Sequence, residues 1–343
     1  MPAHPALAWH ADALQQRLAA LLPGLTVEVV ASIASTNTEL LARARGVGPI
    51  ANAGHGPAAI APCLLVAEHQ TQGRGRQGKV WQSSLGDSLT FSLLLPLALA
   101  DWSGLSLAVG LALADALDPP QPGQPVRLGL KWPNDLLLLA PPAPVAPGAA
   151  PARPVIGGKL GGILIETVQV GALRLAVVGV GLNLRPPPAA PDEPGAGPAP
   201  GWGQAGLQAL HPRLDAPTAL ARVAAPLLQA VLAFEQGGFA PLRQRFAARD
   251  VLLGRAVTTT LADLPAGTAD GVDDGGTLWL RLPAGAAGVA GVAGVAGAAD
   301  GLAGAGQRRP VRSGEISLRL AVGPQSLGAN QQDPLASPTV RLC

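Results

Sequence analysis

Apolar and polar residues alternate along the chain with periods of about 3.6 and 2, and these periods predict a mixture of helices and strands. Leucines at helical spacing predict a helix over residues 10–22, which ends at a Pro-Gly pair. Residues 101–117 are apolar on nearly every side, so a helix there should lie buried between layers. Further helices are expected over 36–45, 215–236 and 241–250, and strands over 26–30, 63–67, 88–95, 126–130, 136–139, 160–167 and 173–184.

The pattern changes after Val251, where only short strands are predicted. The segment Asp273-Asp274-Gly275-Gly276 is typical of a hairpin turn, and residues 313–320 read as a last strand. We therefore expect a large α+β domain followed by a small all-β one. The predicted limits are 1–247 and 248–322, with a tail over 323–343.

Glycine and proline are frequent, with 44 and 35 residues in a chain of 343, roughly twice ordinary usage. Much of the excess falls in three blocks, 140–158, 185–203 and 283–309, which we predict to be disordered insertions in a folded protein. The third block repeats Gly-Val-Ala but has no Gly-X-Pro pattern, so a collagen-like structure is excluded.

The apolar composition predicts neither a membrane protein nor a secreted one. Mean hydropathy is +0.31. However, charged residues or prolines interrupt the apolar segments before they reach the roughly 20 residues that a membrane-spanning helix needs. The start of the chain lacks a signal-peptide pattern, and Cys63 and Cys343 form no disulfide framework. We expect a cytoplasmic protein. The histidines show no metal-ligand spacing, so no metal held by the protein is predicted, and a net charge of +2 does not indicate a polyanionic partner.

The sequence of a glycine-rich basic loop, Gly73–Lys79, matches two phosphate-binding motifs. Both GxGxxG and GxxxxGK require a helix to begin at the loop, so that the helix N-terminus faces the phosphate. Here the loop leads into a strand, and Val80 offers no hydroxyl to Mg²⁺, so both readings are rejected. What remains is a loop whose Arg74, Arg76 and Lys79 could clamp an anion. The simpler alternative, a solvated basic turn, would apply if the loop stood alone.

Three other segments carry polar chemistry. Lys131-Trp132-Pro133-Asn134-Asp135 ends an apolar strand, where a lysine is costly unless it is paired or placed over an anion. Ser35-Thr36-Asn37 precedes a helix, and Thr36 with Glu39 matches a capping box; the same groups could bind a neutral polar ring. Lys159 enters a strand between two glycine pairs.

Taken in order, these segments resemble the biotin protein ligases, which attach biotin to the carrier protein of acetyl-CoA carboxylase. The resemblance runs from about Val27 to Leu320, interrupted by the low-complexity blocks. It also includes Gln70-Thr71-Gln72, Gly179-Val180-Gly181-Leu182-Asn183, Phe234-Glu235-Gln236 and Gly314-Glu315-Ile316-Ser317-Leu318-Arg319. It implies an α+β fold: a class II synthetase-like mixed β-sheet with helices, followed by a small SH3-like β-barrel domain.

The resemblance also implies the residues of the site. The catalytic residues would be Lys131 and Arg76. Biotin would contact Ser35, Thr36, Asn37, Gln70, Gly73, Arg74, Gly75, Arg76 and Lys131. The nucleotide would contact Arg76, Lys79, Trp81, Asn134, Lys159 and Asn183. At Lys79 the family often has arginine, so a compact charge replaces a bidentate fork.

The implied reaction is ATP-dependent activation of biotin to biotinyl-5'-AMP, then transfer of biotin to a lysine of the apo biotin carboxyl carrier protein of acetyl-CoA carboxylase. ATP and biotin are substrates, Mg²⁺ arrives with ATP, and the family allows a homodimer. Some members carry an N-terminal DNA-binding domain, but the segment before Thr26 has room for one helix, so nucleic acid is not an expected partner. A membrane is not expected either, because the apolar runs are interrupted. Two alternatives stay open: a lipoate–protein ligase, and a biotin- or adenylate-binding module without turnover. The basic loop and the Lys131 segment favour biotin ligation.

Overall fold

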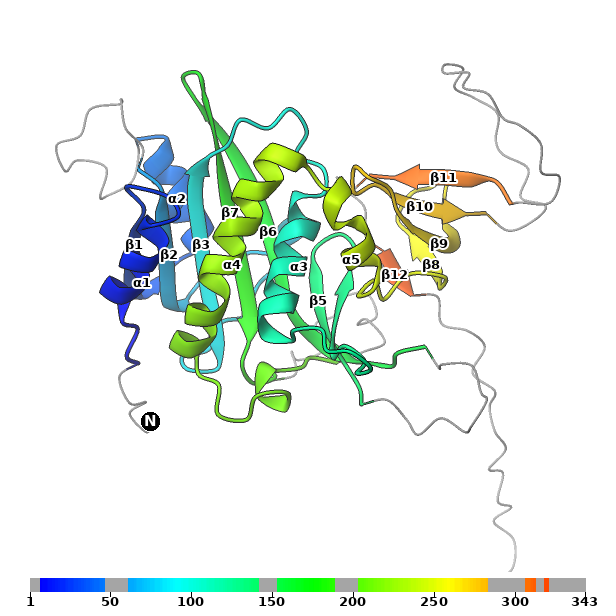
Figure 1. Cartoon of the computed structure of the whole chain (residues 1–343), viewed down its shortest axis with the longest axis horizontal. Helices are drawn as coiled ribbons and strands as arrows, with labels where there is room; N and C mark the ends of the chain where they lie inside the picture. Colours follow the sequence, from blue (N-terminus) through cyan, green and yellow to red (C-terminus); the bar gives the residue numbers. More distant parts are fainter. Residues whose placement is uncertain are drawn as a thin grey trace, which may run out of the picture.

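The structure is a computed structural model that describes residues 7–46, 61–141, 153–188, 203–282, 306–312 and 318–320. A seven-stranded sheet and a five-stranded sheet lie next to each other (Figure 1). The large sheet has the strand order β1-β2-β3-β7-β6-β5-β4. Its strands are β1 (Thr26–Ile33), β2 (Cys63–Gln70), β3 (Ser88–Pro96), β4 (Leu128–Lys131), β5 (Asp135–Leu139), β6 (Ile156–Val170) and β7 (Leu173–Asn183). Strands β1 and β2 are parallel and the other neighbours antiparallel, so the sheet is mixed, as predicted.

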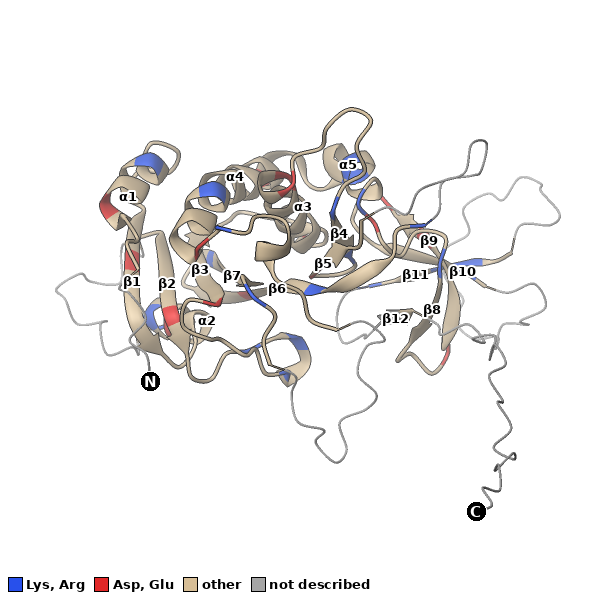
Figure 2. Ribbon diagram, turned by 90° about the horizontal axis from the view of Figure 1, so that it is seen from below, with Lys and Arg blue, Asp and Glu red and all other residues tan. Residues whose placement is uncertain are grey.

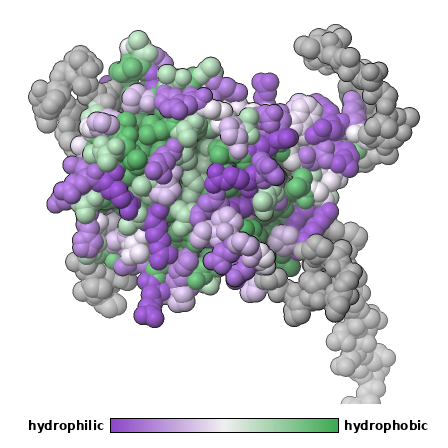
Figure 3. Space-filling model, in the orientation of Figure 1, coloured by the Kyte–Doolittle hydropathy of each residue, from purple (hydrophilic) through white to green (hydrophobic). Residues whose placement is uncertain are grey.

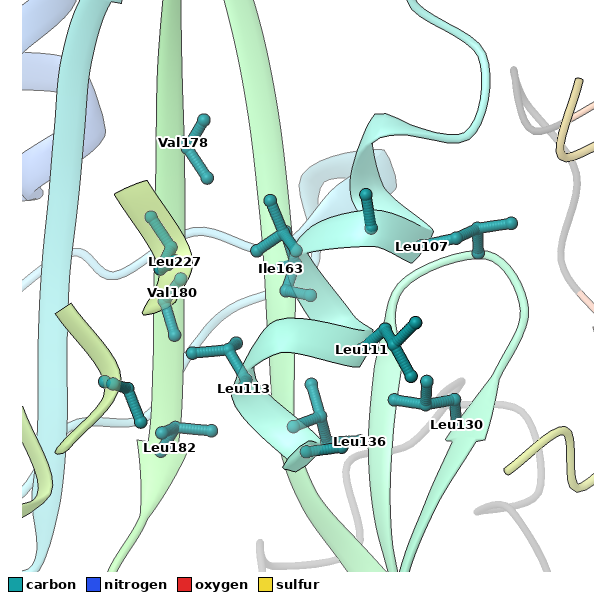
Figure 4. Close-up of a cluster of buried hydrophobic side chains, with 14 of the residues drawn as sticks. Leu107, Leu111, Leu113, Leu130, Leu136, Ile163, Val178, Val180, Leu182 and Leu227 are labelled. Atoms are coloured by element: carbon teal, nitrogen blue, oxygen red, sulfur yellow. The ribbon is translucent and has the colours of Figure 1, made fainter. Parts of the chain in front are cut away.

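Helices cover both faces of the large sheet. They are α1 (Ala11–Ala19), α2 (Thr36–Ala44), α3 (Leu105–Leu117) and α4 (Ala216–Gly237). Val178, Val180 and Leu182 of β7 point into the core under α3 and α4 (Figure 4). Side chains alternate along a strand, so Val177 and Gly179 face the opposite side, where Val177 packs with the leucines of α2. The site described below lies on the α2 side.

The two longest helices are apolar because they form the core. Leu107, Leu111 and Leu113 of α3 are all buried (Figure 4), which agrees with the predicted all-round burial. Among the described residues, α4 alone is long and apolar enough to cross a bilayer, yet 50% of that stretch is buried inside the protein. Its packing is that of a core helix, and the surface over this face mixes hydrophilic and hydrophobic side chains (Figure 3).

The small sheet is antiparallel and has the order β11-β10-β9-β8-β12. Its strands are β8 (Ala256–Thr259), β9 (Ala266–Val272), β10 (Leu278–Arg281), β11 (Arg308–Val311) and β12 (Leu318–Leu320), and α5 (Arg243–Ala247) precedes it. The predicted turn joins β9 to β10, and Asp273 Oδ1 accepts the N–H groups of Gly275 and Thr277. The α+β fold class is therefore confirmed, whereas the domain limits at 247 and 248 stay a prediction.

Several predicted element limits were wrong. The cap of α2 is Ser35, not Thr36: the Ser35 Oγ accepts the N–H of Thr38 at 3.4 Å. Glu39 pairs with Arg43 at 2.8 Å and so does not complete a capping box. The helix predicted from residue 101 begins at Leu105, and the one predicted over 241–250 is limited to α5 after a short 3₁₀ turn.

The low-complexity blocks also end earlier than composition suggested. Ile156, Gly157 and Gly158 belong to β6, and a Cβ on Gly158 would lie 2.8 Å from the Gln204 carbonyl carbon. Residues 308–309 belong to β11. These glycines permit close packing of strands, which composition alone cannot distinguish from flexibility. The rest of the three blocks lies largely outside the described residues, as do the tail 323–343 and residues 313–317 of the last predicted strand.

Replacing Asp250 by asparagine is expected to stabilise the protein above neutral pH. Burial raises the pKa of Asp250 to about 6, so the folded protein holds this proton more tightly than the unfolded chain does. Ionising the carboxyl at higher pH therefore costs stability, about 1–3 kcal/mol for a shift of this size. Asparagine keeps an acceptor for the Leu252 N–H, which Asp250 Oδ1 accepts at 2.9 Å.

Urea unfolding of Asp250→Asn at several pH values checks this expectation. The gain should be full above pH 6 and vanish below about pH 4. Asp215 provides a control of opposite sign, because the hydrogen bond from Thr218 lowers its pKa. A gain that is independent of pH would contradict the account.

Candidate active site

The face of the large sheet on the α2 side carries mainly glycines and small hydroxyl side chains where β3, β7 and β6 pair. Gly179 and Gly181 of β7 lie opposite Ser92 and Thr90 of β3, and Gly181 also lies opposite Gly162 of β6. Directly paired residues point to the same face of a sheet. We call these five residues the glycine floor. Other chain segments can approach the backbone closely there.

Two side chains from other segments lie on this floor. A Cβ added at Gly179 would be 2.2 Å from Asn37 Oδ1, and one added at Gly181 would be 2.5 Å from the Trp81 ring. Any side chain at either position would displace its neighbour. The glycines of the segment 179–183 therefore have a steric reason: they admit Asn37 and Trp81 to the face of the sheet.

A network of polar side chains lies at one end of the floor. The backbone N–H of Thr36 donates to Gln70 Oε1 at 2.7 Å, and the Thr36 hydroxyl lies 3.1 Å from the same oxygen. The Ser92 hydroxyl is 2.6 Å from that of Thr36 and donates to Asn37 Oδ1 at 2.6 Å. Asn37 Nδ2 donates to Glu166 Oε2 at 2.9 Å. We call these five residues the polar network.

The polar network brings together Thr36, Asn37 and Gln70, three of the expected biotin contacts. Ser35, a fourth, lies beside them as the cap of α2, and all four are buried. Ser92 and Glu166 were not predicted as members. Ser92 had a readable signal, since Ser88, Thr90 and Ser92 alternate with apolar residues along β3 and therefore share one face of the strand.

A second cluster lies over Gly162 and contains two ammonium groups and one carboxylate. Lys159 Nζ is 2.6 Å from Asp135 Oδ1, and Lys131 Nζ is 3.4 Å from Asp135 Oδ2. A Cβ on Gly162 would lie 3.7 Å from Lys159 Nζ and 3.8 Å from Asp135 Oδ1. We call Lys131, Asp135 and Lys159 the lysine–carboxylate cluster. Figure 2 shows basic segments, in blue, on β4 and β6.

Burial and mutual charge set the pKa values in this cluster. The Lys131 side chain is 8% exposed, and burial lowers its pKa more than the attraction of Asp135 raises it. Burial alone would raise the pKa of Asp135, but the two ammonium groups together hold it below its usual value. Asp135 is thus ionised at neutral pH, and it was not predicted to be a site residue.

Further cations make the surroundings of the cluster positive. Arg76 Nη1 donates to Asn134 Oδ1 at 3.3 Å, and the charge of Asp135 acts on Arg76 as well. Burial lowers the pKa of Arg76, as it does for Lys131. The charge of Lys79 also depresses the pKa of Lys131. One carboxylate thus faces several cations, an arrangement suited to anions.

The basic loop runs between the polar network and the lysine–carboxylate cluster. It folds back on itself: Trp81 N–H donates to Gly73 O at 2.9 Å, and Gly75 N–H donates to Lys79 O at 2.7 Å. Arg74 reaches toward the polar network, with Nη2 3.9 Å from Glu166 Oε1. Arg76 reaches the other way, toward Asn134. The two loop arginines therefore serve different ends of the site.

Asn183 lies deeper than the other predicted nucleotide contacts. It is 2% exposed and donates to Gln204 Oε1 at 3.4 Å. Gln204 forms a β-bridge with Lys159, so Asn183 supports the segment beside Lys159. Within the described residues no group of three or more His, Cys, Asp and Glu side chains could hold a metal ion.

Lysine usage gives a sequence signal that motif reading missed. The chain contains three lysines, Lys79, Lys131 and Lys159, and every one belongs to this site, whereas its other basic residues are arginines. A residue type confined to one site points to chemistry that arginine does not supply there. This signal makes Lys159 as strong a candidate for the chemistry as Lys131, whereas the motifs predicted it only as one of several nucleotide contacts.

Comparison with known proteins identifies relatives of this chain. The profile of the Biotin/lipoate A/B protein ligase family matches residues 58–183. The biotin–[acetyl-CoA-carboxylase] ligase of Paracoccus denitrificans is 35% identical over 263 residues, 73% of this chain and 92% of that protein. The ligase of the same name from Mycobacterium tuberculosis is 38% identical, over 47% of this chain and half of that protein. The bifunctional ligase/repressor BirA of Escherichia coli is 31% identical, over 88% of this chain and 76% of that protein.

A solved structure shows the same fold. The biotin protein ligase of Aquifex aeolicus, in complex with biotin and ATP, superposes with a TM-score of 0.57 at 21% identity, covering 86% of this chain and 99% of that one. The large mixed sheet followed by a small antiparallel sheet is therefore an architecture that this chain shares with that enzyme.

Proposed function

The chain belongs to the biotin protein ligases of the biotin/lipoate A/B family, and from this premise we propose how its site activates and transfers biotin. The activity is that of a biotin–[acetyl-CoA-carboxylase] ligase, an ATP-dependent enzyme. One observation carries the proposed mechanism: the lysine–carboxylate cluster, with its excess of cations, lies on the same glycine floor as the polar network, whose donors and acceptors are uncharged except for Glu166.

The dimensions suit a small molecule with one polar ring and one carboxylate. Gly179, under Asn37, and Gly181 are two residues apart along β7, or about 7 Å. Gly162, under the cluster, lies one strand across from Gly181, or about 5 Å. Biotin would place its ureido ring against the polar network and its carboxylate against the cluster. Arg74 and Arg76 would then cover the two ends.

In the first step, a biotin carboxylate oxygen bonds to the α-phosphorus of ATP, and pyrophosphate leaves. Two anions must approach each other, so the barrier is largely electrostatic. Lys131, Lys159 and Arg76 supply fixed positive charge where negative charge accumulates. Lys79 adds charge from the loop, and Trp81 would leave the floor to pack against adenine.

In the second step, the neutral amine of a carrier lysine attacks the acyl carbon of biotinyl-5'-AMP. An amide bond forms, the bond from the acyl carbon to the phosphate oxygen breaks, and AMP leaves as the attacking nitrogen gives up one proton. The basic loop would shield the adenylate from water until the carrier docks. The relatives' names imply a biotin-carrier substrate; we propose the apo biotin carboxyl carrier protein.

Mg²⁺ would enter as part of the ATP substrate. Asp135, the carboxylate at the cluster, is already held by two lysines, so phosphate oxygens would supply most of the metal's ligands.

We place the enzyme in the cytoplasm and allow a homodimer, in which β1, an edge strand, could extend the sheet. The expectation that it binds no nucleic acid stays a prediction.

The assay that tests this proposal uses the purified protein with apo carrier protein, ATP, Mg²⁺ and either biotin or lipoate. Labelling with biotin, accompanied by biotin-dependent release of pyrophosphate, is expected. Labelling with lipoate alone would establish the lipoate–protein ligase, an alternative that the named relatives do not favour. Binding of biotin without pyrophosphate release would establish a module without turnover.

Alanine at Gly179 should weaken biotin binding. Its Cβ would displace the Asn37 amide from between Ser92 and Glu166, and losing a buried polar partner reduces affinity by roughly 10–100-fold. Calorimetric titration with biotin measures the effect. Gly203→Ala is the control, because nothing lies within 4 Å of a Cβ there. Equal affinities for the two variants would mean that Asn37 does not contact biotin.

A further inference from the structure

The C-terminal sheet contacts the turn that follows Lys131, and the proposed mechanism makes no use of this contact. Trp132, next to Lys131, is 1% exposed, and its indole N–H donates to Gly276 O at 3.0 Å. Gly276 is the last residue of the turn that joins β9 to β10. A side chain of the large domain, adjacent to the catalytic lysine, is therefore tied to the backbone of the small sheet.

The strand that leads to Lys131 is held from the same direction. The N–H of Leu130 donates to Arg249 O at 2.8 Å, and the N–H of Val251 donates to Leu130 O at 3.0 Å. Residues 249–251 connect α5 to the small sheet. β4 is an edge strand of the large sheet, so this connection covers its outer side. Lys131 therefore stands between two backbone attachments that both belong to the C-terminal part of the chain.

The hairpin turn itself is fitted closely against the large domain. A Cβ at Gly276 would lie 2.6 Å from the Cα of Gly104, the N-cap residue of α3. Both glycines have φ near +80°, a conformation that other residues rarely adopt. The turn is held internally by Asp273, which accepts the indole N–H of Trp279 at 2.9 Å as well as two backbone N–H groups. Its carbonyl at Gly276 is thus presented at a fixed place.

We propose that the C-terminal sheet positions Lys131 through the hydrogen bond from Trp132 to Gly276, so that Trp132 is a positioning residue of the ligase. The inference rests on the proposed function only for its catalytic consequence. The positioning itself concerns the exposure and placement of one lysine. It also gives the small sheet a role in the first step of the reaction.

Amine labelling tests the positioning without reference to catalysis. With three lysines in the chain, acetylation followed by mass spectrometry reports each one separately, and the exposed Lys79 and the N-terminal amine serve as internal references. Trp132→Phe should raise the labelling rate of Lys131 about tenfold, the change expected from losing one buried hydrogen bond. Trp9→Phe removes an indole N–H of the same kind, which donates to Glu68 Oε1 at 2.8 Å outside the C-terminal sheet, and should leave that rate unchanged.

Asp273→Ala provides a second variant that leaves the core around Trp132 intact. It should loosen the turn and raise Lys131 labelling in the same way, even if Trp132→Phe fails to fold. The proposal is overturned if Lys131 is labelled at the wild-type rate in Trp132→Phe and in Asp273→Ala, or in the one of them that folds. A rise in Trp9→Phe as large as in Trp132→Phe would also overturn it.

Catalysis gives the second readout. Trp132→Phe should lower adenylate formation by about 10–100-fold, as a misplacement of about 1 Å can, but should cause no further loss in a Lys131→Met background. An equal loss in both backgrounds would show a general structural effect and refute positioning. If the wild-type protein releases no pyrophosphate with biotin, the proposed function fails, while the labelling result still decides whether Lys131 is held by Trp132.

Discussion

Replacing Lys131 by methionine is expected to lower biotin-dependent pyrophosphate release by about 10²–10³-fold, the usual effect of removing one preorganised charge from a transition state. Lys131 is the most buried cation of the cluster, so its charge is the least screened by water. Methionine keeps most of the apolar volume of the side chain. Thermal stability should be unchanged or slightly higher, because a charge that is costly to bury is removed while Asp135 keeps Lys159.

The other two lysines provide matched controls for this substitution. Lys159→Met should be nearly as damaging, because Lys159 forms the shorter contact with Asp135, 2.6 Å. Lys79→Met should have a smaller effect, because Lys79 is exposed on the loop. Initial rates of pyrophosphate release under saturating substrates rank the three. A Lys131→Met enzyme that keeps more than a third of the wild-type rate would remove Lys131 from the mechanism.

The sequence was informative about the site where spacing along the chain expresses a local structure. Ser35, Thr36 and Asn37 share one helix start, and Arg74, Arg76 and Lys79 share one loop, so their grouping could be predicted. The role of Asp135 could not. Its contact with Lys131 is local, but its contact with Lys159 depends on the pairing of β5 with β6, and pairing register is a tertiary property.

The glycines also show that the sequence does not reveal tertiary contacts. Gly73, Gly179 and Gly181 all match motifs, but the sequence does not say which atoms come close to each. In the fold, Gly179 admits Asn37, and Gly181 and Gly73 both admit Trp81. The glycines at residues 157 and 158 were misread as flexible for the converse reason: they lie where two segments pack. Composition measures how much glycine is present, whereas function depends on what approaches each one.

The two halves of the site also differ in how they meet a ligand. Apart from Glu166, the polar network is buried, and it is largely satisfied by its own hydrogen bonds, so a ligand there must share or replace existing partners. The lysine–carboxylate cluster has more cations than anions, so a negative ligand adds interactions without breaking any. We therefore expect the network to select biotin by shape and hydrogen bonds, and the cluster to contribute mainly to the rate.

Replacing Asp135 by asparagine is expected to be the most destabilising change in the site. Lys131 and Lys159 would lose their shared carboxylate and repel each other in partly buried surroundings. Removing one partner of a buried ion pair typically costs about 3–5 kcal/mol, and because Lys159 is 30% exposed, we expect about 3 kcal/mol. Adenylate formation should fall as well, because neither ammonium group would keep its place.

The pH dependence of this loss follows from the directions of the two pKa shifts. The pKa of Asp135 lies below its usual value because the two lysines outweigh burial, so its stabilising contribution is present at neutral pH and disappears as pH falls through the folded-state pKa. The pKa of Lys131 is already lowered by burial and falls further without Asp135. As pH rises toward 10, Lys131 in the variant loses its proton, and the destabilisation caused by the missing carboxylate becomes smaller.

The stability gap between wild type and Asp135→Asn should therefore be widest near neutral pH and narrow on both sides. Urea unfolding between pH 3 and pH 10 measures it. Asp87→Asn is the control, since its ion pair with Arg185 at 3.0 Å is exposed and should contribute less than about 0.5 kcal/mol at any pH. A stability difference that stays constant across this pH range would show that Asp135 acts through packing. The mechanism could then no longer rest on Asp135 balancing the charges of the two lysines.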